Sequence, residues 1–225
     1  ETQIESDRRE ISEKILRIKK SLVKVMKTRS LHRKSREKLN IPIIALVGYT
    51  NAGKSSIFNA LTNAGVIAQD MLFATLDPTM RSIFLLEKKE IILSDTVGFI
   101  SNLPTGLISA FKATLEEVTN ADLILHVQDI SHPDSKLQAL AVDQVLEELD
   151  WEHRVKPPII QIYNKIDKLS FGDLKRMKAR YKKFSDPVLL SAVSKDGFQF
   201  LEHTISKYLE PKKQRDSIVL GLHEG

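Results

Sequence analysis

The sequence predicts an α/β fold in which a mostly parallel sheet is flanked by helices and preceded by a long amphipathic basic helix. Two patterns lead to this expectation. After Asn40, continuous runs of Ile, Val and Leu alternate with helical stretches, which is typical of a parallel sheet covered on both faces. Before Asn40, apolar residues recur at spacings of three, four and seven, as in a helix with a coiled-coil-like seam. The 225 residues are 42% hydrophobic, enough to close a core.

The expected elements alternate along the chain after residue 40. Strands are expected at 43–47, 82–86, 91–93, 123–127, 159–163 and 188–190. Helices are expected at 54–62, 107–119, 134–149, 171–183 and 198–209. This alternation predicts three parts: a basic helix over 1–40, an α/β domain over 41–211, and a C-terminal tail over 212–225.

Positive charge is concentrated in the first part. Residues 1–40 hold 13 Lys or Arg against 6 Asp or Glu, although the whole chain carries only +5. A basic helix flank could face a polyanion such as RNA, and it could equally be a solvated surface. Both interpretations stay open on the sequence alone.

The amino-acid composition limits the cellular location and the kinds of metal site that we expect. The chain has no Cys, which excludes disulfides and thiolate zinc sites and fits a reducing, cytoplasmic location. No apolar run approaches the roughly 18 residues of a membrane-spanning helix, so we expect no stable membrane insertion. The six His residues show no metal-ligand spacing, and we expect them to be ordinary surface or core residues.

A phosphate-binding loop is predicted between the first strand and the first helix of the domain. The sequence there fits G-x-x-x-x-G-K-[ST], with successive N–H groups and a helix N-terminus turned toward phosphates. Lys54 supplies a point charge, and the Ser55 hydroxyl is a candidate Mg²⁺ ligand. These features indicate a P-loop NTPase. The loop residues are Gly48, Tyr49, Thr50, Asn51, Ala52, Gly53, Lys54 and Ser55.

Three further motifs follow in order. The D-x-x-G motif, where the Asp faces the metal and the Gly N–H faces the γ-phosphate, consists of Asp95, Thr96, Val97 and Gly98. The next motif offers a carboxylate that matches two adjacent donors of guanine but would be unpaired against adenine; it consists of Asn164, Lys165, Ile166 and Asp167. Asn164 itself could reach guanine N7 or stabilise neighbouring loops. After the last strand, a backbone N–H in Ser191, Ala192 and Val193 would complete the base pocket. The order of motifs predicts a G domain that uses GTP.

The sequence around these motifs resembles that of the HflX family of the TRAFAC GTPases. The resemblance rests on the P-loop, on the run from Phe73 to Thr79, on Asp95 to Ile100 with Leu103-Pro104, and on upstream matches at Glu1-Thr2-Gln3 and Asp7-Arg8-Arg9. It therefore covers nearly the whole chain. One departure is Ser56, where the family usually has Thr. The family's usual N-terminal domain would lie before Glu1, so we expect this chain to be a piece of a longer protein.

The resemblance implies a site and a function. Its first switch would comprise Phe73, Ala74, Thr75, Leu76 and Asp77. Thr75 would be the second Mg²⁺ ligand beside Ser55, and Lys54, Thr75 and Gly98 would take part in hydrolysis. The family binds the large ribosomal subunit and its RNA and splits stalled or idle ribosomes, so these become the expected partners beside GTP and GDP.

Hydrolysis raises a separate question, because Phe99 stands where Ras-like enzymes have a water-orienting Gln. An apolar ring cannot orient water, so we expect slow intrinsic hydrolysis and interpret Phe99 as packing. Asn51 is a candidate K⁺ ligand beside the phosphates, and the docked partner is the other source of activation. A regulatory switch that binds a protein partner, without a ribosomal role, remains the alternative; an ATP-driven enzyme conflicts with Asp167.

Overall fold

The computed structural model divides into two compact units, Glu1–Ile41 and Pro42–Gly225. It describes residues 41–62, 79–85, 89–99, 115, 117–149, 151, 156–181 and 187–210. Nearly all of these residues belong to the second unit. The predicted basic helix at 1–40 and the tail at 212–225 lie outside the described residues, so the three-part division of the chain stays a prediction.

A six-stranded sheet forms the centre of the second unit, in the order β2-β3-β1-β4-β5-β6. Its strands are β1 (Ile43–Gly48), β2 (Thr79–Phe84), β3 (Glu90–Asp95), β4 (Leu123–Asp129), β5 (Ile159–Asn164) and β6 (Val188–Leu189). All neighbouring pairs are parallel except β2 with β3. The expected mostly parallel sheet is therefore confirmed, with one antiparallel strand at its edge.

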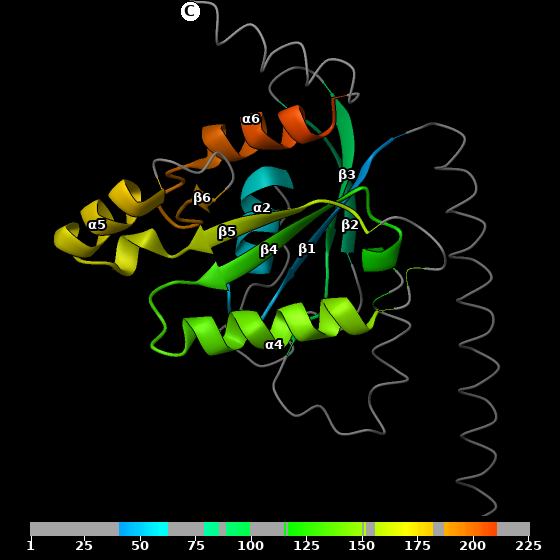
Figure 1. Ribbon diagram of the computed structural model, residues 1–225. Helices are drawn as coiled ribbons and strands as arrows, with labels where there is room; N and C mark the ends of the chain where they lie inside the picture. Colours follow the sequence, from blue (N-terminus) through cyan, green and yellow to red (C-terminus); the bar gives the residue numbers. More distant parts are fainter. Residues whose placement is uncertain are drawn as a thin grey trace, which may run out of the picture. The chain divides into compact units, whose positions relative to one another are not determined.

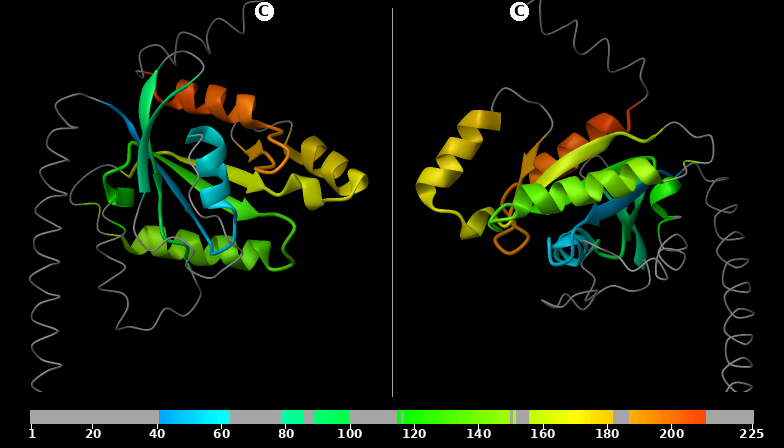
Figure 2. Two further views of the ribbon diagram at one scale, coloured as in Figure 1. Left: turned by 180° about the vertical axis from the view of Figure 1, so that it is seen from behind. Right: turned by 60° about the horizontal axis from the view of Figure 1, so that its bottom comes forward.

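Helices cover both faces of the sheet (Figure 1). Figure 2 shows α4 (Ser135–Glu148) on one face, with α2 (Lys54–Thr62) and α6 (Phe198–Tyr208) on the other. The remaining elements, η1 (Ile166–Lys168) and α5 (Phe171–Tyr181), follow β5. None of the described helices has the length and apolar character that a bilayer-crossing segment requires.

The continuous apolar strands become buried because both faces are covered. All six residues of β1 are buried. Alternate residues of a strand point to opposite faces, so β1 contributes Ile44 and Leu46 to the core shared with α2 and α6. That core also contains Ile57 and Phe58 of α2. On the other face, α4 buries Val142 and Leu146. The strands thereby form a rigid base whose carboxyl ends carry the predicted motifs.

Most expected elements agree with the structure to within a few residues. The exceptions concern the edge strand and one helix. Strand β2 begins at Thr79 rather than at 82, because its first half is paired with β3 although it lacks an apolar run. The helix expected at 107–119 falls mostly outside the described residues; Leu115 and 117–119 are helical.

A substitution at Gly197 tests how tightly the connection between β6 and α6 constrains the backbone. Its φ is +83°, and an added Cβ would lie 2.2 Å from the carbonyl oxygen of Leu189. We expect Gly197→Ala to lower the free energy of unfolding by about 1–3 kcal/mol, since both backbone strain and a steric clash arise. Urea-induced unfolding followed by circular dichroism measures the change.

Gly172 is the matched control. It lies in the first turn of α5, and the nearest atom to an added Cβ is Ser170 Oγ at 3.9 Å. Gly172→Ala should leave the stability unchanged or raise it by up to about 1 kcal/mol, because Ala favours the helix. Equal stability of the two variants would contradict the constraint assigned to Gly197.

Candidate functional site

The carboxyl ends of four parallel strands meet at one edge of the sheet, the edge at which open α/β sheets bind ligands. Strand β1 leads into the P-loop, β3 ends at Asp95, β4 at Asp129 and β5 at Asn164. Registry places Leu46 beside Asp95 and Asp129 beside Asn164. Three of the four predicted motifs therefore start at one sheet edge, and the fourth follows β6 next to β5.

The P-loop is curled by unusual backbone conformations. Asn51 has φ of +60° and Gly53 has φ of +96°. An added Cβ on Gly53 would lie 2.1 Å from Nδ2 of Asn164, so the loop needs glycine for this close approach to β5. The helix that follows, α2, begins at Lys54, so the loop precedes a helix N-terminus as predicted for an anion-binding turn.

Lys54 is buried at the centre of the loop, with 6% of its surface exposed. Its Nζ donates hydrogen bonds to the carbonyl oxygens of Gly48 (3.1 Å) and Tyr49 (3.0 Å). Burial lowers the pKa of Lys54 from 10.5 to about 8, although the carboxylate of Asp95 opposes this shift. A buried ammonium of this kind favours an anionic ligand, because added negative charge would stabilise the proton.

Ser55 and Asp95 form an oxygen-rich pair beside the loop. The Ser55 hydroxyl donates to Asp95 Oδ2 at 2.7 Å, and Asp95 is fully buried. Hydroxyl and carboxylate oxygens are the donors that Mg²⁺ prefers, and Mg²⁺ usually takes only one or two protein ligands together with phosphate oxygens. The donor set therefore fits Mg²⁺. No group of three or more His, Cys, Asp or Glu in the described part of the chain could hold a metal by itself.

Backbone hydrogen bonds attach the D-x-x-G segment to the P-loop. The Phe99 N–H donates to Gly48 O at 3.1 Å, and Thr50 N–H donates to Phe99 O at 2.8 Å. A Cβ on Gly98 would lie 3.1 Å from Lys54 Nζ, which places Gly98 against this buried lysine. The Phe99 ring is 1% exposed, as expected for a packing residue.

Asn164 connects the P-loop to the loop after β6. Its Nδ2 donates to Ala52 O at 2.9 Å, and its Oδ1 accepts from the Ala192 N–H at 3.1 Å. Both polar ends of the amide thus contact neighbouring loops. Of the two roles that the sequence left open for Asn164, the structure displays the loop-stabilising one.

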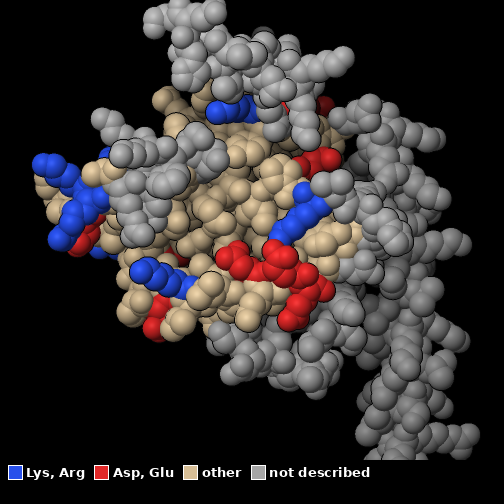
Figure 3. Space-filling model, viewed as in Figure 1, with Lys and Arg blue, Asp and Glu red and all other residues tan. Residues whose placement is uncertain are grey.

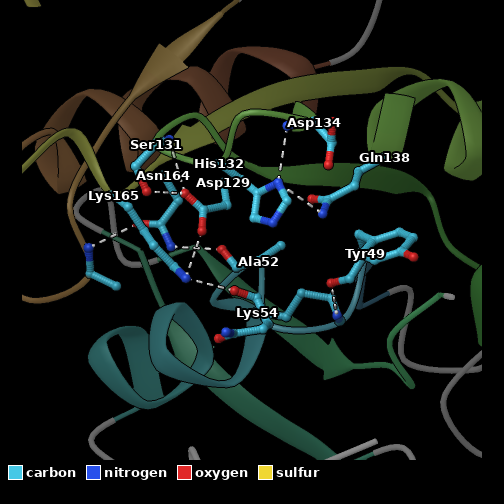
Figure 4. Close-up of polar contacts among 12 residues, drawn as sticks. Tyr49, Ala52, Lys54, Asp129, Ser131, His132, Asp134, Gln138, Asn164 and Lys165 are labelled. Carbon is cyan, nitrogen blue, oxygen red and sulfur yellow. Dashed lines mark hydrogen bonds and ion pairs between the residues drawn. The ribbon is translucent and has the colours of Figure 1, made fainter. Parts of the chain in front are cut away.

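A second connection was not anticipated from the sequence: Asp129 pairs with Lys165 (Figure 4). Lys165 Nζ lies 2.8 Å from Asp129 Oδ2 and donates to Asn51 O at 2.7 Å. Ser131 donates to Asp129 through both N–H (2.9 Å) and Oγ (2.6 Å). Burial raises the Asp129 pKa, but the hydrogen bonds from Lys165 and Ser131 outweigh it, so the pKa is lowered overall. The sequence signal was an Asp at a strand end, D-x-S, which is too common to single out.

The expected base-recognition residues lie next to this cluster. Asp167 is exposed in η1, directly after Lys165 and Ile166. Ser191 is buried, and its Oγ accepts hydrogen bonds from the N–H groups of Val193 and Ser194. Val193 is 83% exposed. The first-switch prediction, from Phe73 through Thr75 to Asp77, lies outside the described residues, so Thr75 stays a prediction.

Comparisons with known proteins find related GTPases. Residues 43–165 match the family model described as "50S ribosome-binding GTPase". GTPase HflX of Magnetococcus marinus is 46% identical over 226 residues, covering 100% of this chain and 51% of that protein. GTPase HflX of Escherichia coli is 42% identical over 225 residues, covering 100% of this chain and 52% of that protein. The chain therefore spans about half the length of these relatives.

Solved structures show the same fold. A GTP-binding protein from the archaeon Sulfolobus solfataricus, in complex with GDP, has a TM-score of 0.55 at 28% identity, covering 84% of this chain and 60% of that one.

The Asp129–Lys165 pair leads to a prediction for nucleotide binding. We expect Asp129→Asn to weaken GDP binding about tenfold, since the partly buried Lys165 ammonium would lose its charged partner and its hold on Asn51 O. Asp173→Asn is the control, because Asp173 forms a solvent-exposed pair with Arg176, which contributes little. Fluorescent-GDP titration compares both variants; an equal effect on both would contradict a specific role for Asp129.

The buried Lys54 leads to a pH prediction for the metal-free protein. Above pH 8 the amine without ligand is largely neutral, so binding of phosphates must draw a proton from solution. In EDTA, GDP affinity should be constant below about pH 8 and fall up to tenfold per pH unit above it. Isothermal titration from pH 7 to 9.5 measures this. Lys54→Met should bind weakly at every pH; a wild-type affinity independent of pH would contradict the expectation.

Proposed function

Because this chain belongs to the family of 50S ribosome-binding GTPases, and within it to the HflX proteins, we propose that it binds GTP, hydrolyses it to GDP and phosphate, and acts on the large ribosomal subunit. The observation that supports the proposal most is that Asp95 and Asn164 both form hydrogen bonds with the P-loop at one edge of the sheet. Relatives named GTPase HflX are about twice as long as this chain, so we propose this activity for the whole protein.

In this proposal the P-loop holds the phosphates. Its curled backbone and the N-terminus of α2 offer N–H groups, and Lys54 offers positive charge already placed by the Gly48 and Tyr49 carbonyls. The archaeal GTP-binding protein that is 28% identical contains GDP, which supports a guanine nucleotide here. Mg²⁺, when bound by Ser55 and Thr75, would neutralise charge on the phosphate oxygens.

Guanine would be recognised at the opposite end of the site. Asp167 is exposed and can accept hydrogen bonds from two adjacent donors of the base. Asn164 and Lys165 place the segment that carries Asp167, since they connect it to Ala52 and Asn51 of the P-loop. The Ser191 hydroxyl shapes the following loop, where a backbone N–H of Ala192 or Val193 would face the base.

Hydrolysis in the isolated domain should be slow. Phe99 is buried and held by backbone hydrogen bonds, so its ring cannot orient an attacking water. Lys54 and the Gly98 N–H would stabilise charge on the transferred phosphoryl group, together with Thr75 of the first switch. Additional help would come from K⁺ near Asn51 or from switch ordering by the docked partner.

The partner in this proposal is the large ribosomal subunit and its RNA. The family model carries that partner in its description, and the proposed outcome is the splitting of stalled or idle ribosomes in the cytoplasm. Hydrolysis would then reset the switches, which are held by γ-phosphate contacts until the phosphate leaves.

Steady-state GTP hydrolysis by the full-length protein, with and without purified large ribosomal subunits, tests the proposal. We expect stimulation of at least about tenfold by the subunits, and a further increase in KCl relative to NaCl if Asn51 supports a K⁺ site. Small subunits provide the control for nonspecific RNA effects.

The alternative outcomes are distinct. No stimulation by large subunits would contradict the ribosomal role and favour a switch that binds a protein partner. Equal rates in KCl and NaCl would remove the K⁺ site but leave the GTPase intact. Hydrolysis of ATP at the rate of GTP would contradict the role assigned to Asp167.

A further inference from the structure

We infer that helix α5 is a docking surface for RNA phosphates and bases. The inference rests on the proposed function, because it assigns to α5 part of the contact with the RNA of the large ribosomal subunit. Four observations lead to it: the local charge, the low burial of the helix, the arrangement of one exposed stripe, and the lack of acidic partners for its lysines among the described residues.

The segment around α5 is strongly basic. Between Lys165 and Lys183 the sequence has eight Lys or Arg residues and only two acidic residues, Asp167 and Asp173. Figure 3 shows Lys and Arg side chains gathered on α5, whereas Asp and Glu side chains gather near α4. Helix α5 is therefore a positively charged part of this face, which would attract a polyanion.

Helix α5 contributes little to the core. None of the α5 side chains that the structure describes is buried, and only Leu174 and Met177 are partly buried. These two residues, three apart, lie on one side of the helix. The remaining described surface of α5 faces solvent and is available to a partner.

One exposed stripe combines an aromatic ring with two lysines. Phe171, Lys175 and Lys178 are spaced at i, i+4 and i+7, which places them on one face of the helix. Phe171 is 84% exposed, and both lysines are exposed. Exposed aromatic rings stack on unpaired bases and lysines neutralise phosphates, so this combination fits RNA.

The charges of this stripe are not balanced within the helix. Asp173 accepts from Ser170 Oγ and pairs with Arg176 at 2.8 Å, which occupies the one acidic side chain of α5. Neither Lys175 nor Lys178 has an ion-pair partner among the residues that the structure describes. A helix stabilised by its own surface would be expected to place Glu or Asp three or four residues from these lysines.

The test uses the full-length protein and two probes: purified large ribosomal subunits and their RNA after protein removal. The α5 variant is Lys175→Gln/Lys178→Gln. The matched control is Lys136→Gln/Lys207→Gln, which removes two exposed lysines from α4 and α6. GDP affinity of each variant verifies that the nucleotide site is intact.

We expect the α5 variant to bind deproteinised RNA on the order of tenfold more weakly at about 0.1 M salt, while the control changes less than about twofold. Its plot of log affinity against log salt should be shallower by about 1.4–1.8, since two phosphate contacts are lost. Phe171→Ala should weaken binding with no change in this slope, because stacking does not release counterions.

Each of the other outcomes would overturn either the docking surface, the assignment to RNA or the proposed ribosomal role. Unchanged RNA affinity of the α5 variant would contradict the docking surface. Loss of binding to subunits with unchanged binding to deproteinised RNA would assign α5 to an acidic protein and overturn the RNA assignment. If the wild type binds RNA through α5 but does not bind subunits, the docking surface stands and the proposed ribosomal role fails.

Discussion

The site depends on the attachment of the P-loop to the end of β5. Asn164 and Lys165 donate hydrogen bonds to two successive P-loop carbonyls, those of Ala52 and Asn51. These carbonyls belong to a tight turn in which Asn51 adopts a left-handed conformation, so regular secondary structure does not supply their partners. A carbonyl without a partner is costly where it is buried, as at the Ala52 hydrogen bond, whereas the Asn51 hydrogen bond is exposed. The side chains at the end of β5 supply those partners, and they thereby fix the P-loop relative to the segment proposed to recognise the base.

Asp129, at the end of β4, also helps to hold the P-loop in place, because it pairs with Lys165. A partly buried lysine is stabilised only when its charge is paired, and the carboxylate at the end of β4 pairs with Lys165 without entering the P-loop itself. On the other side, the backbone of Phe99 is hydrogen-bonded to Gly48 and Thr50. The phosphate loop is therefore held by contacts from the ends of β3, β4 and β5, and such preorganisation lowers the entropic cost of binding.

Sequence reasoning reached the fold, and it located the motifs that the structure brings to one sheet edge, because the responsible signals are local. Continuous apolar runs define β1 and β4, and a glycine-rich turn followed by Lys54 has few alternative meanings. Asp129 was missed because its partner Lys165 is distant in sequence, and only the adjacent pairing of β4 and β5 brings them together. Strand β2 was misplaced at its start because an edge strand is specified by pairing with β3 rather than by hydrophobicity. Thr75 and the N-terminal helix remain predictions.

The position of α5 connects the two proposals. The helix begins at Phe171, four residues after Asp167, so the segment between them is short. A ligand that binds α5 therefore acts on a segment whose other end carries Asp167, the carboxylate proposed to recognise the base. Binding free energies are linked reciprocally: if RNA at α5 changes the affinity for guanine nucleotide by some factor, nucleotide must change the affinity for RNA by the same factor. Such a coupling would operate through the proposed base end of the site, independently of the γ-phosphate contacts proposed to hold the switches.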